Sequence, residues 1–186
     1  MSLDDVMLET EEKMASAVDY LKQEFRGIRT GRASAGLVDH IKVEYYGSPT
    51  DLRQLASIST PDANLIIIKP FDPGSLKEIE RAIQKSELGI NPNTDGKVIR
   101  LVVPPLSMER RGQLASQLKK MSEAARVTIR NARRDGNKGV DAVEKEKEIT
   151  EDQAAAARQD VQELTKKYEA AVDELLAGKT KEVQET

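Results

Sequence analysis

Three long segments of this chain repeat apolar or small residues at alternating intervals of three and four positions, the pattern of amphipathic helices. The stripe of the first segment is Leu3, Met7, Thr10, Met14, Ala17, Leu21, Glu24 and Ile28. The stripe of the second is Leu114, Leu118, Met121, Ala125, Thr128 and Ala132. The stripe of the third is Ala154, Ala157, Val161, Leu164, Tyr168, Ala171 and Leu175. Because a lone amphipathic helix in water would expose its stripe, we expect the three segments to pack together.

The sequence therefore predicts an elongated three-helix bundle, with helices of about 40 to 60 Å at 1.5 Å per residue. A homodimeric coiled coil is the alternative. A strong turn signal separates the second and third segments, and it ends in Thr150-Glu151-Asp152-Gln153, a capping box. This turn favours a bundle formed within one chain, and hence a monomer.

Other residues mark where the helices should begin, weaken and end. Ser107 is the expected N-cap of the second helix, and Gly178 marks the expected fraying end of the third. Gly136 and Gly139 fall inside the second helix, where each should cost about 1 kcal/mol relative to alanine. We therefore expect this helix to be weakened beyond Arg134.

Residues 31–105 differ from the flanking segments because short apolar runs alternate there with glycine and proline turns. The expected strands are Ile41–Tyr45, Leu65–Ile68 and Val98–Val103, and the expected turns include Gly47-Ser48-Pro49. A helix should precede the last strand, opened by a capping box of Ser75 and Glu78 and closed by Gly89 and Ile90. The predicted fold is α+β, with a small β/α/β sandwich domain of residues 31–105 inserted into a bundle of residues 1–30 and 106–186.

The insertion creates two junctions that must lie side by side, because the helices they interrupt belong to one bundle. Arg29, Thr30, Gly31 and Arg32 form one junction, and Pro104 and Pro105 form the other. Glycine frees the backbone of the first and proline stiffens the second, which indicates a hinge of limited freedom. A rigid elbow is the alternative.

The composition leaves little room for catalysis. The chain has no cysteine, which excludes disulfides and thiolate metal sites, and its only histidine, His40, is expected at the surface. Residues 27–34 resemble a phosphate-binding loop only superficially, since they lack the G-K-[ST] signature and follow a helix. We expect a protein that is not an enzyme and that holds no metal or cofactor.

Nothing in the sequence indicates a membrane partner. No apolar run approaches the roughly 18 residues that span a bilayer. The N-terminus is acidic and has no apolar segment of the kind found in signal peptides. A cytoplasmic location is the simplest expectation.

Charge is concentrated in one stretch of a chain whose formal net charge is −3. Residues 108–138 hold nine basic and three acidic residues, a balance of +6. On a helix Lys119, Arg126, Arg130 and Arg133 would fall within about 60° of one another. Such a stripe predicts an oriented contact with the phosphates of RNA or DNA, and a merely solvated face is the alternative.

Several strings along the chain resemble the bacterial ribosome recycling factor family. They are Ile28–Ser34, Glu44–Pro49, Leu52–Ser57, Leu88–Asn93, Pro104–Leu106 with Glu109–Arg111, and Val127–Asp135. The resemblance covers essentially the whole chain in order. It implies an L-shaped, tRNA-like protein whose long arm is the three-helix bundle and whose short arm is the inserted domain.

The resemblance also implies a function, namely ribosome recycling after translation termination. Such a factor binds the post-termination ribosome with its bundle on large-subunit rRNA, and elongation factor G then uses GTP to separate the subunits. Family motifs place rRNA contacts at Arg110, Arg130, Arg133 and Arg134, to which the charge stripe adds Lys119 and Arg126. A coiled-coil chaperone or adaptor without an RNA role is the alternative, and a nucleotide hydrolase is a third possibility.

Overall fold

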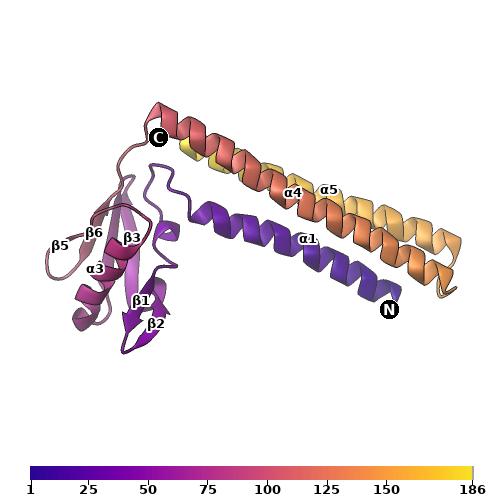
Figure 1. Ribbon diagram of the computed structural model, residues 1–186, viewed down its shortest axis with the longest axis horizontal. Coiled ribbons are helices and arrows are strands. Elements are labelled where there is room, and N and C mark those ends of the chain that lie inside the picture. The colour runs from indigo at the N-terminus through magenta and orange to yellow at the C-terminus, as the bar shows by residue number, and fades with distance from the viewer. Residues whose placement is uncertain (186) are drawn as a thin grey trace. The chain divides into compact units, whose positions relative to one another are not determined.

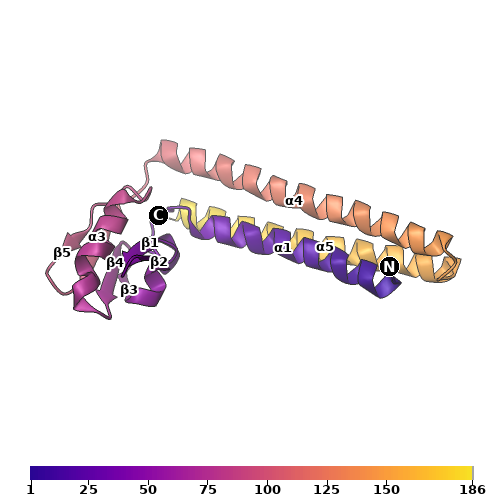
Figure 2. The ribbon, with the colours of Figure 1, turned by 60° about the horizontal axis from the view of Figure 1, so that its bottom comes forward.

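The computed structural model describes residues 1–185, which fall into two compact units. The first unit comprises Met1–Phe25 and Gln113–Lys181, and the second comprises Arg26–Gly112 with the C-terminal residues from Glu182 onward. The first unit is built from three long helices, α1 (Leu3–Arg26), α4 (Met108–Lys145) and α5 (Glu151–Gln184). These helices lie side by side (Figures 1 and 2), so the predicted three-helix bundle is confirmed.

Two of the predicted helix starts are confirmed by their capping hydrogen bonds. The Ser107 hydroxyl accepts a hydrogen bond from the backbone N–H of Arg110 at 3.2 Å. At the start of α5, the Gln153 N–H donates to the Thr150 hydroxyl at 3.2 Å, and the Thr150 N–H donates to the Gln153 side chain at 2.9 Å. This reciprocal pair is the expected capping box.

The predicted helix ends were less accurate. Helix α1 ends at Arg26, so Ile28 lies outside it, and α5 continues past Gly178 to Gln184. Gly178 is exposed and its missing side chain would meet no other atom within 4 Å. Gly178 therefore lowers the intrinsic helix propensity of this segment but does not end the helix. The buried face of α5 continues to Val183.

The buried face of α4 is rotated relative to the predicted stripe. Ser122 and Ile129 are fully buried, whereas Thr128 is exposed and Met121 is only partly buried. On α5 the corresponding shift brings Thr165 and Val172 into the core. The predicted positions Leu164, Tyr168, Ala171 and Leu175 are partly buried instead. Small residues differ little in hydrophobicity from polar ones, so spacing alone could not decide which of two neighbouring helix positions faces the core.

The two glycines of α4 mark a close helix contact. Helix α4 runs through Gly136 and Gly139 to Lys145. A Cβ atom on Gly136 would lie 2.6 Å from the hydroxyl oxygen of Thr10, and one on Gly139 would lie 2.7 Å from a methyl carbon of Val6. The glycines thus let α1 approach the backbone of α4 more closely than any larger residue would allow.

The second unit contains a two-stranded hairpin of β1 (Lys42–Tyr45) and β2 (Ser48–Asp51). Tyr46 and Gly47 form its turn, with φ angles of 49° and 79°. Two positive φ angles are the geometry of a type I′ hairpin turn. The predicted turn at residues 47–49 is therefore correct only for Gly47, and Pro49 lies in the strand.

A four-stranded antiparallel sheet forms the other layer of the second unit. Its order is β3 (Ala56–Asp62), β4 (Leu65–Pro70), β6 (Ile99–Val102) and β5 (Asn93–Thr94). The predicted strands at residues 41–45, 65–68 and 98–103 correspond to β1, β4 and β6, while β2, β3 and β5 were not predicted. The sheet packs on a core that includes Val38, Val43, Leu52, Ile66, Ile68, Ile79, Ile83, Ile99 and Leu101.

Short helices complete the second unit: η1 (Ala35–Leu37), α2 (Leu52–Leu55), η2 (Pro73–Ser75) and α3 (Leu76–Lys85). The predicted capping box of Ser75 and Glu78 is wrong. The Ser75 hydroxyl donates to the Asp72 carbonyl at 2.7 Å, and Glu78 pairs with Arg81 at 3.3 Å. The predicted C-cap at Gly89 is also wrong, because α3 ends four residues earlier at Lys85. The predicted α+β class, a bundle with an inserted small domain, is confirmed.

Candidate nucleic-acid interface

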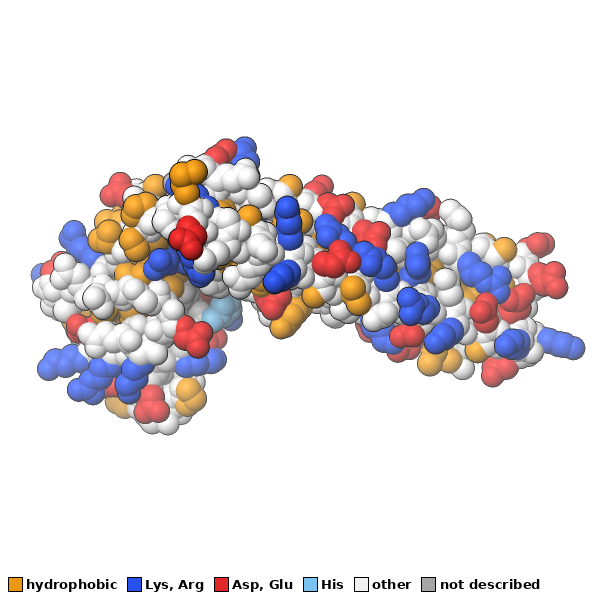
Figure 3. Space-filling view, turned by 45° about the horizontal axis from the view of Figure 1, so that its top comes forward, with side chains coloured by type: hydrophobic (Ala, Val, Ile, Leu, Met, Phe, Trp, Pro, Cys, Tyr) orange, Lys and Arg blue, Asp and Glu red, His pale blue; other side chains and the backbone are white. Residues whose placement is uncertain are grey.

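The basic stretch of residues 108–138 lies on α4, which is helical throughout and so gives each cation a defined angular position. Lys and Arg side chains follow one side of the long-helix unit in Figure 3, interleaved with Asp and Glu. This mixture means that each cation must be judged by its own neighbours.

Arg126 and Arg130 are engaged in ion pairs along the seam between α4 and α5. The Arg126 guanidinium lies 2.5 Å from Asp173 on α5 and 3.4 Å from Glu123 on α4. Arg130 lies 3.0 Å from Glu123 and 3.5 Å from Glu169 on α5. Asp173 and Glu123 together raise the pKa of the Arg126 guanidinium above its ordinary value, with the Asp173 hydrogen bond as the larger cause.

The same seam continues toward the far end of the bundle, where Arg158 of α5 pairs with Asp141 at 2.7 Å and Glu144 at 2.5 Å. These bridges join the two antiparallel helices. Arg126, whose side chain is 22% exposed, therefore already has a role in holding the bundle together. A phosphate could reach Arg126 or Arg130 only in competition with these carboxylates.

Lys119, Arg133 and Arg134 form no ion pair with any residue in 1–185. Lys119 and Arg134 are exposed, and Arg133 is half-buried. Their charges are the ones available to an outside anion. Of the predicted contact residues, these three fit a phosphate interface best.

Two cations that the sequence reasoning omitted belong with them. Lys120 and Lys138 are exposed on α4 and also form no ion pair within residues 1–185. At 100° per residue Lys120, Arg134 and Lys138 fall within about 40° of each other on the outward side of α4. We call Lys119, Lys120, Arg133, Arg134 and Lys138 the basic ridge. Lys119 and Arg133 lie about 100° and 140° around α4 from Lys120, on the side of Arg126 and Arg130, so these five residues share the lack of an ion pair within residues 1–185 and not one helical angle.

Arg110 does not join this ridge. It is exposed in the first turn of α4, about 180° around the helix from Lys119 and about 80° from Lys120, and it lies two to three helical turns before them along the axis. Its inclusion among the predicted contacts came from a sequence motif.

The junction residues are anchored on the turn between β3 and β4. The Ala33 N–H donates to the Ala63 carbonyl at 2.6 Å, and the Val103 N–H donates to the Asn64 carbonyl at 2.7 Å. With its side-chain amide nitrogen facing the carbonyls, Asn64 also donates to the Gly31 carbonyl at 3.2 Å. The turn therefore holds the two linkers side by side, a role for Asn64 that no sequence pattern indicated.

The predicted junction residues differ in exposure. Thr30 and Gly31 are buried, Arg29 is half-buried, and Arg32, Pro104 and Pro105 are exposed. Gly31 has a φ angle of 80°, in the region that favours glycine. Gly31, which was predicted to give the first linker its backbone freedom, thus has a backbone conformation that residues with a side chain adopt only under strain.

No group of three or more His, Cys, Asp or Glu residues within 1–185 is arranged to hold a metal ion. His40 is exposed, as predicted. Over the same residues, no helix combines the length and apolar character needed to cross a membrane.

Comparison with known proteins identifies relatives along the whole chain. The family model described as "Ribosome recycling factor" matches residues 21–183. The ribosome-recycling factor of Acetivibrio thermocellus is 52% identical over 94% of this chain and 96% of its own length. That of Nitratidesulfovibrio vulgaris is 46% identical and covers 100% of both chains.

Solved structures show the same likeness. A solution structure of the ribosome recycling factor aligns with a TM-score of 0.83 at 42% identity, covering 100% of this chain and 99% of its own. A second structure describes models for the Thermus thermophilus ribosome recycling factor and the Escherichia coli elongation factor G bound to the E. coli post-termination complex. Its matching chain aligns with a TM-score of 0.72 at 36% identity, covering 98% of this chain and 99% of that chain.

Proposed function

The chain belongs to the ribosome recycling factor family, and we infer that it separates the subunits of the post-termination ribosome together with elongation factor G and GTP. The observation that carries this function is the full-length match to the family. Its members include a factor studied with elongation factor G on a post-termination complex. The protein is a non-enzymatic translation factor, whose partners are the ribosome and elongation factor G. We propose that it acts in the cytoplasm.

Subunit release tests this function directly. Purified protein added to post-termination ribosomes is expected to release subunits only when elongation factor G and GTP are both present, as followed by light scattering. The protein alone should hydrolyse neither GTP nor ATP. Release without the elongation factor, or nucleotide turnover that survives repurification, would contradict the proposal.

We propose that the basic ridge contacts large-subunit rRNA. Cations that have no carboxylate partner can neutralise phosphates without first breaking an ion pair, and each contact releases condensed counterions. Arg126 and Arg130 then act mainly by fixing α4 against α5, which keeps the ridge in place. Arg110 remains a separate proposed contact that rests on its motif.

We also propose that residues 29–32 together with Pro104 and Pro105 act as a hinge between the bundle and the inserted domain. The hydrogen bonds from both linkers to the Ala63-Asn64 turn support this proposal, since they hold the two linkers together at one turn. The boundaries of the discontinuous bundle, residues 1–30 and 106–186, belong to the same proposal.

A Gly31→Ala variant tests the hinge. An alanine at a φ of 80° is strained by about 1 kcal/mol, so the linker backbone should shift from its present path. We expect subunit release to slow about threefold to tenfold while ribosome binding changes less.

Gly89→Ala is the matched control, because Gly89 also has a positive φ, 68°, and a Cβ there would meet no atom within 4 Å. It should lose similar stability and release subunits at the normal rate. Equal slowing in both variants would show that lost stability, not the hinge, explains the result.

A further inference from the structure

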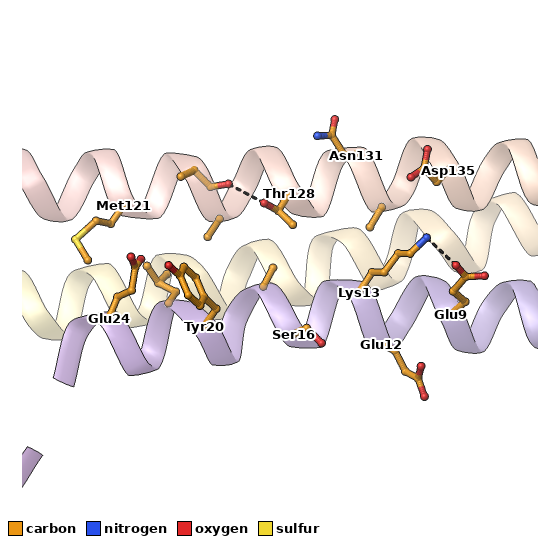
Figure 4. A pocket seen from close by; sticks show the side chains of 15 residues that line it. Glu9, Glu12, Lys13, Ser16, Tyr20, Glu24, Met121, Thr128, Asn131 and Asp135 are labelled. Carbon is orange, nitrogen blue, oxygen red and sulfur yellow. Dashed lines mark hydrogen bonds and ion pairs between the residues drawn. The ribbon is translucent and has the colours of Figure 1, made fainter. Parts of the chain in front are cut away.

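A groove with a volume of about 650 Å³ runs between α1 and α4 on the bundle unit (Figure 4). Its floor is made of small or buried apolar residues, Ala17, Leu21, Ala125 and Ala132, and its walls include Tyr20, Met121 and Ala124. Tyr20 is 63% exposed, a large apolar surface for a residue beside a core. The groove extends from Glu9 to Glu24 along α1, about 22 Å or four helical turns.

The groove begins where the close contact of the glycines ends. Thr10 touches the Gly136 position, and Asp135 beside it lines the groove. Further along, Met121 and Thr128 belong to the predicted 4-3 stripe of α4, yet Met121 is only partly buried and Thr128 is exposed. The stripe is therefore wider than the three helices of this chain can bury, and the uncovered part faces the groove.

The rim of the groove has a charge opposite to that of the basic ridge. Four carboxylates line it, Glu9, Glu12, Glu24 and Asp135, against one cation, Lys13. Lys13 is already paired with Glu9 at 2.8 Å. Such a rim repels nucleic acid, and it would also repel the same acidic groove of a second copy.

We propose that this groove is the docking site of a partner protein's amphipathic helix with basic flanks. A helix of about four turns, with apolar residues at intervals of three and four, would cover Tyr20 and Met121 and complete the stripe of α4 as a fourth helix. Lysine or arginine on its flanks would face Glu12, Glu24 and Asp135. The basic ridge borders the α4 wall of the groove, because Lys120 directly precedes Met121 and Arg134 directly precedes Asp135.

A synthetic peptide tests the proposal without ribosomes, so its outcome is independent of the recycling function. The probe is a 16-residue helical peptide with leucine at the 3-4 positions and lysine on both flanks. A matched peptide carries glutamate in place of lysine. The lysine peptide is expected to shift the backbone amide resonances of the groove-lining residues on α1 and α4, and the glutamate peptide is expected not to.

Two variants make the test specific. Ala124→Phe fills the groove from an exposed position and should weaken binding of the lysine peptide about tenfold. Ala170→Phe, the same change at an exposed site of α5 outside the groove, should leave binding unchanged. Glu12→Lys changes only the rim and should weaken binding about threefold or more, with a reduced dependence on salt.

The proposal is overturned if the peptide does not bind, if its shifts map to another surface, or if Ala124→Phe binds as the unmodified protein does. Circular dichroism shows whether Ala124→Phe folds, and if it does not, Glu12→Lys alone decides the outcome.

Discussion

A Gly136→Val variant is expected to lower the free energy of unfolding by about 3 kcal/mol. The first carbon of any side chain at this position would lie 2.6 Å from the hydroxyl oxygen of Thr10 and 2.9 Å from its methyl carbon. Valine adds two further carbons, so α1 must move away from α4 and the contacts on either side of it are lost. Urea denaturation followed by circular dichroism measures the change.

Gly178→Val is the control, because a side chain there meets no atom within 4 Å and the residue is also inside a helix. Its stability should change by no more than about 0.5 kcal/mol. Thr10→Ala should restore about 1 kcal/mol or more to the Gly136→Val variant, since it removes the two atoms nearest the added carbon. If Gly136→Val and Gly178→Val lose the same stability, the close helix contact is not what the glycine provides.

The glycines illustrate what the sequence could and could not predict about the bundle. The alternating spacing of apolar residues identified all three helices, because a helix face that is buried repeats apolar residues every three or four positions within one segment. The same spacing could not show that α1 passes close to Gly136, since that depends on a residue more than a hundred positions away. From the sequence alone, Gly136 and Gly139 therefore showed only the free-energy cost that any glycine has in a helix.

The inserted domain shows a second limit. Strand β4 was predicted because Leu65–Ile68 is apolar, and β1 because its residues alternate. Strand β3 reads Ala-Ser-Ile-Ser-Thr-Pro-Asp and is mostly exposed, so hydrophobicity carries little sign of it. It forms an edge of the sheet, where hydrogen bonds to β4 define the strand and polar side chains face water.

The candidate interface was predicted as a stripe because cations recur at helical intervals along α4. That pattern is local, whereas the partners of Arg126 and Arg130 include Asp173 and Glu169 on α5. No rule of spacing links a cation to a carboxylate on another helix before the helices are placed. The structure therefore divides the stripe into residues that hold the bundle and residues that remain available to an anion.

This division leads to the largest effect expected on binding. Arg133→Glu should weaken ribosome binding about tenfold or more at low salt, because it removes one phosphate contact and places a negative charge beside the rRNA. The dependence of log K on log salt concentration should become shallower by about 0.7 to 0.9. Stability should change by less than about 0.5 kcal/mol, since Arg133 forms no ion pair within residues 1–185.

Two other charge reversals separate the possible causes. Arg126→Glu puts a carboxylate against Asp173 and Glu123, so it should lower stability by about 1 kcal/mol and affect binding less than Arg133→Glu does. Arg81→Glu, at a 67% exposed side chain on α3, should change neither binding nor its salt dependence. Titration of ribosomes at several salt concentrations measures all three. If Arg133→Glu and Arg81→Glu bind equally well with the same slope, the ridge is a solvated face and the rRNA contact lies elsewhere on the protein.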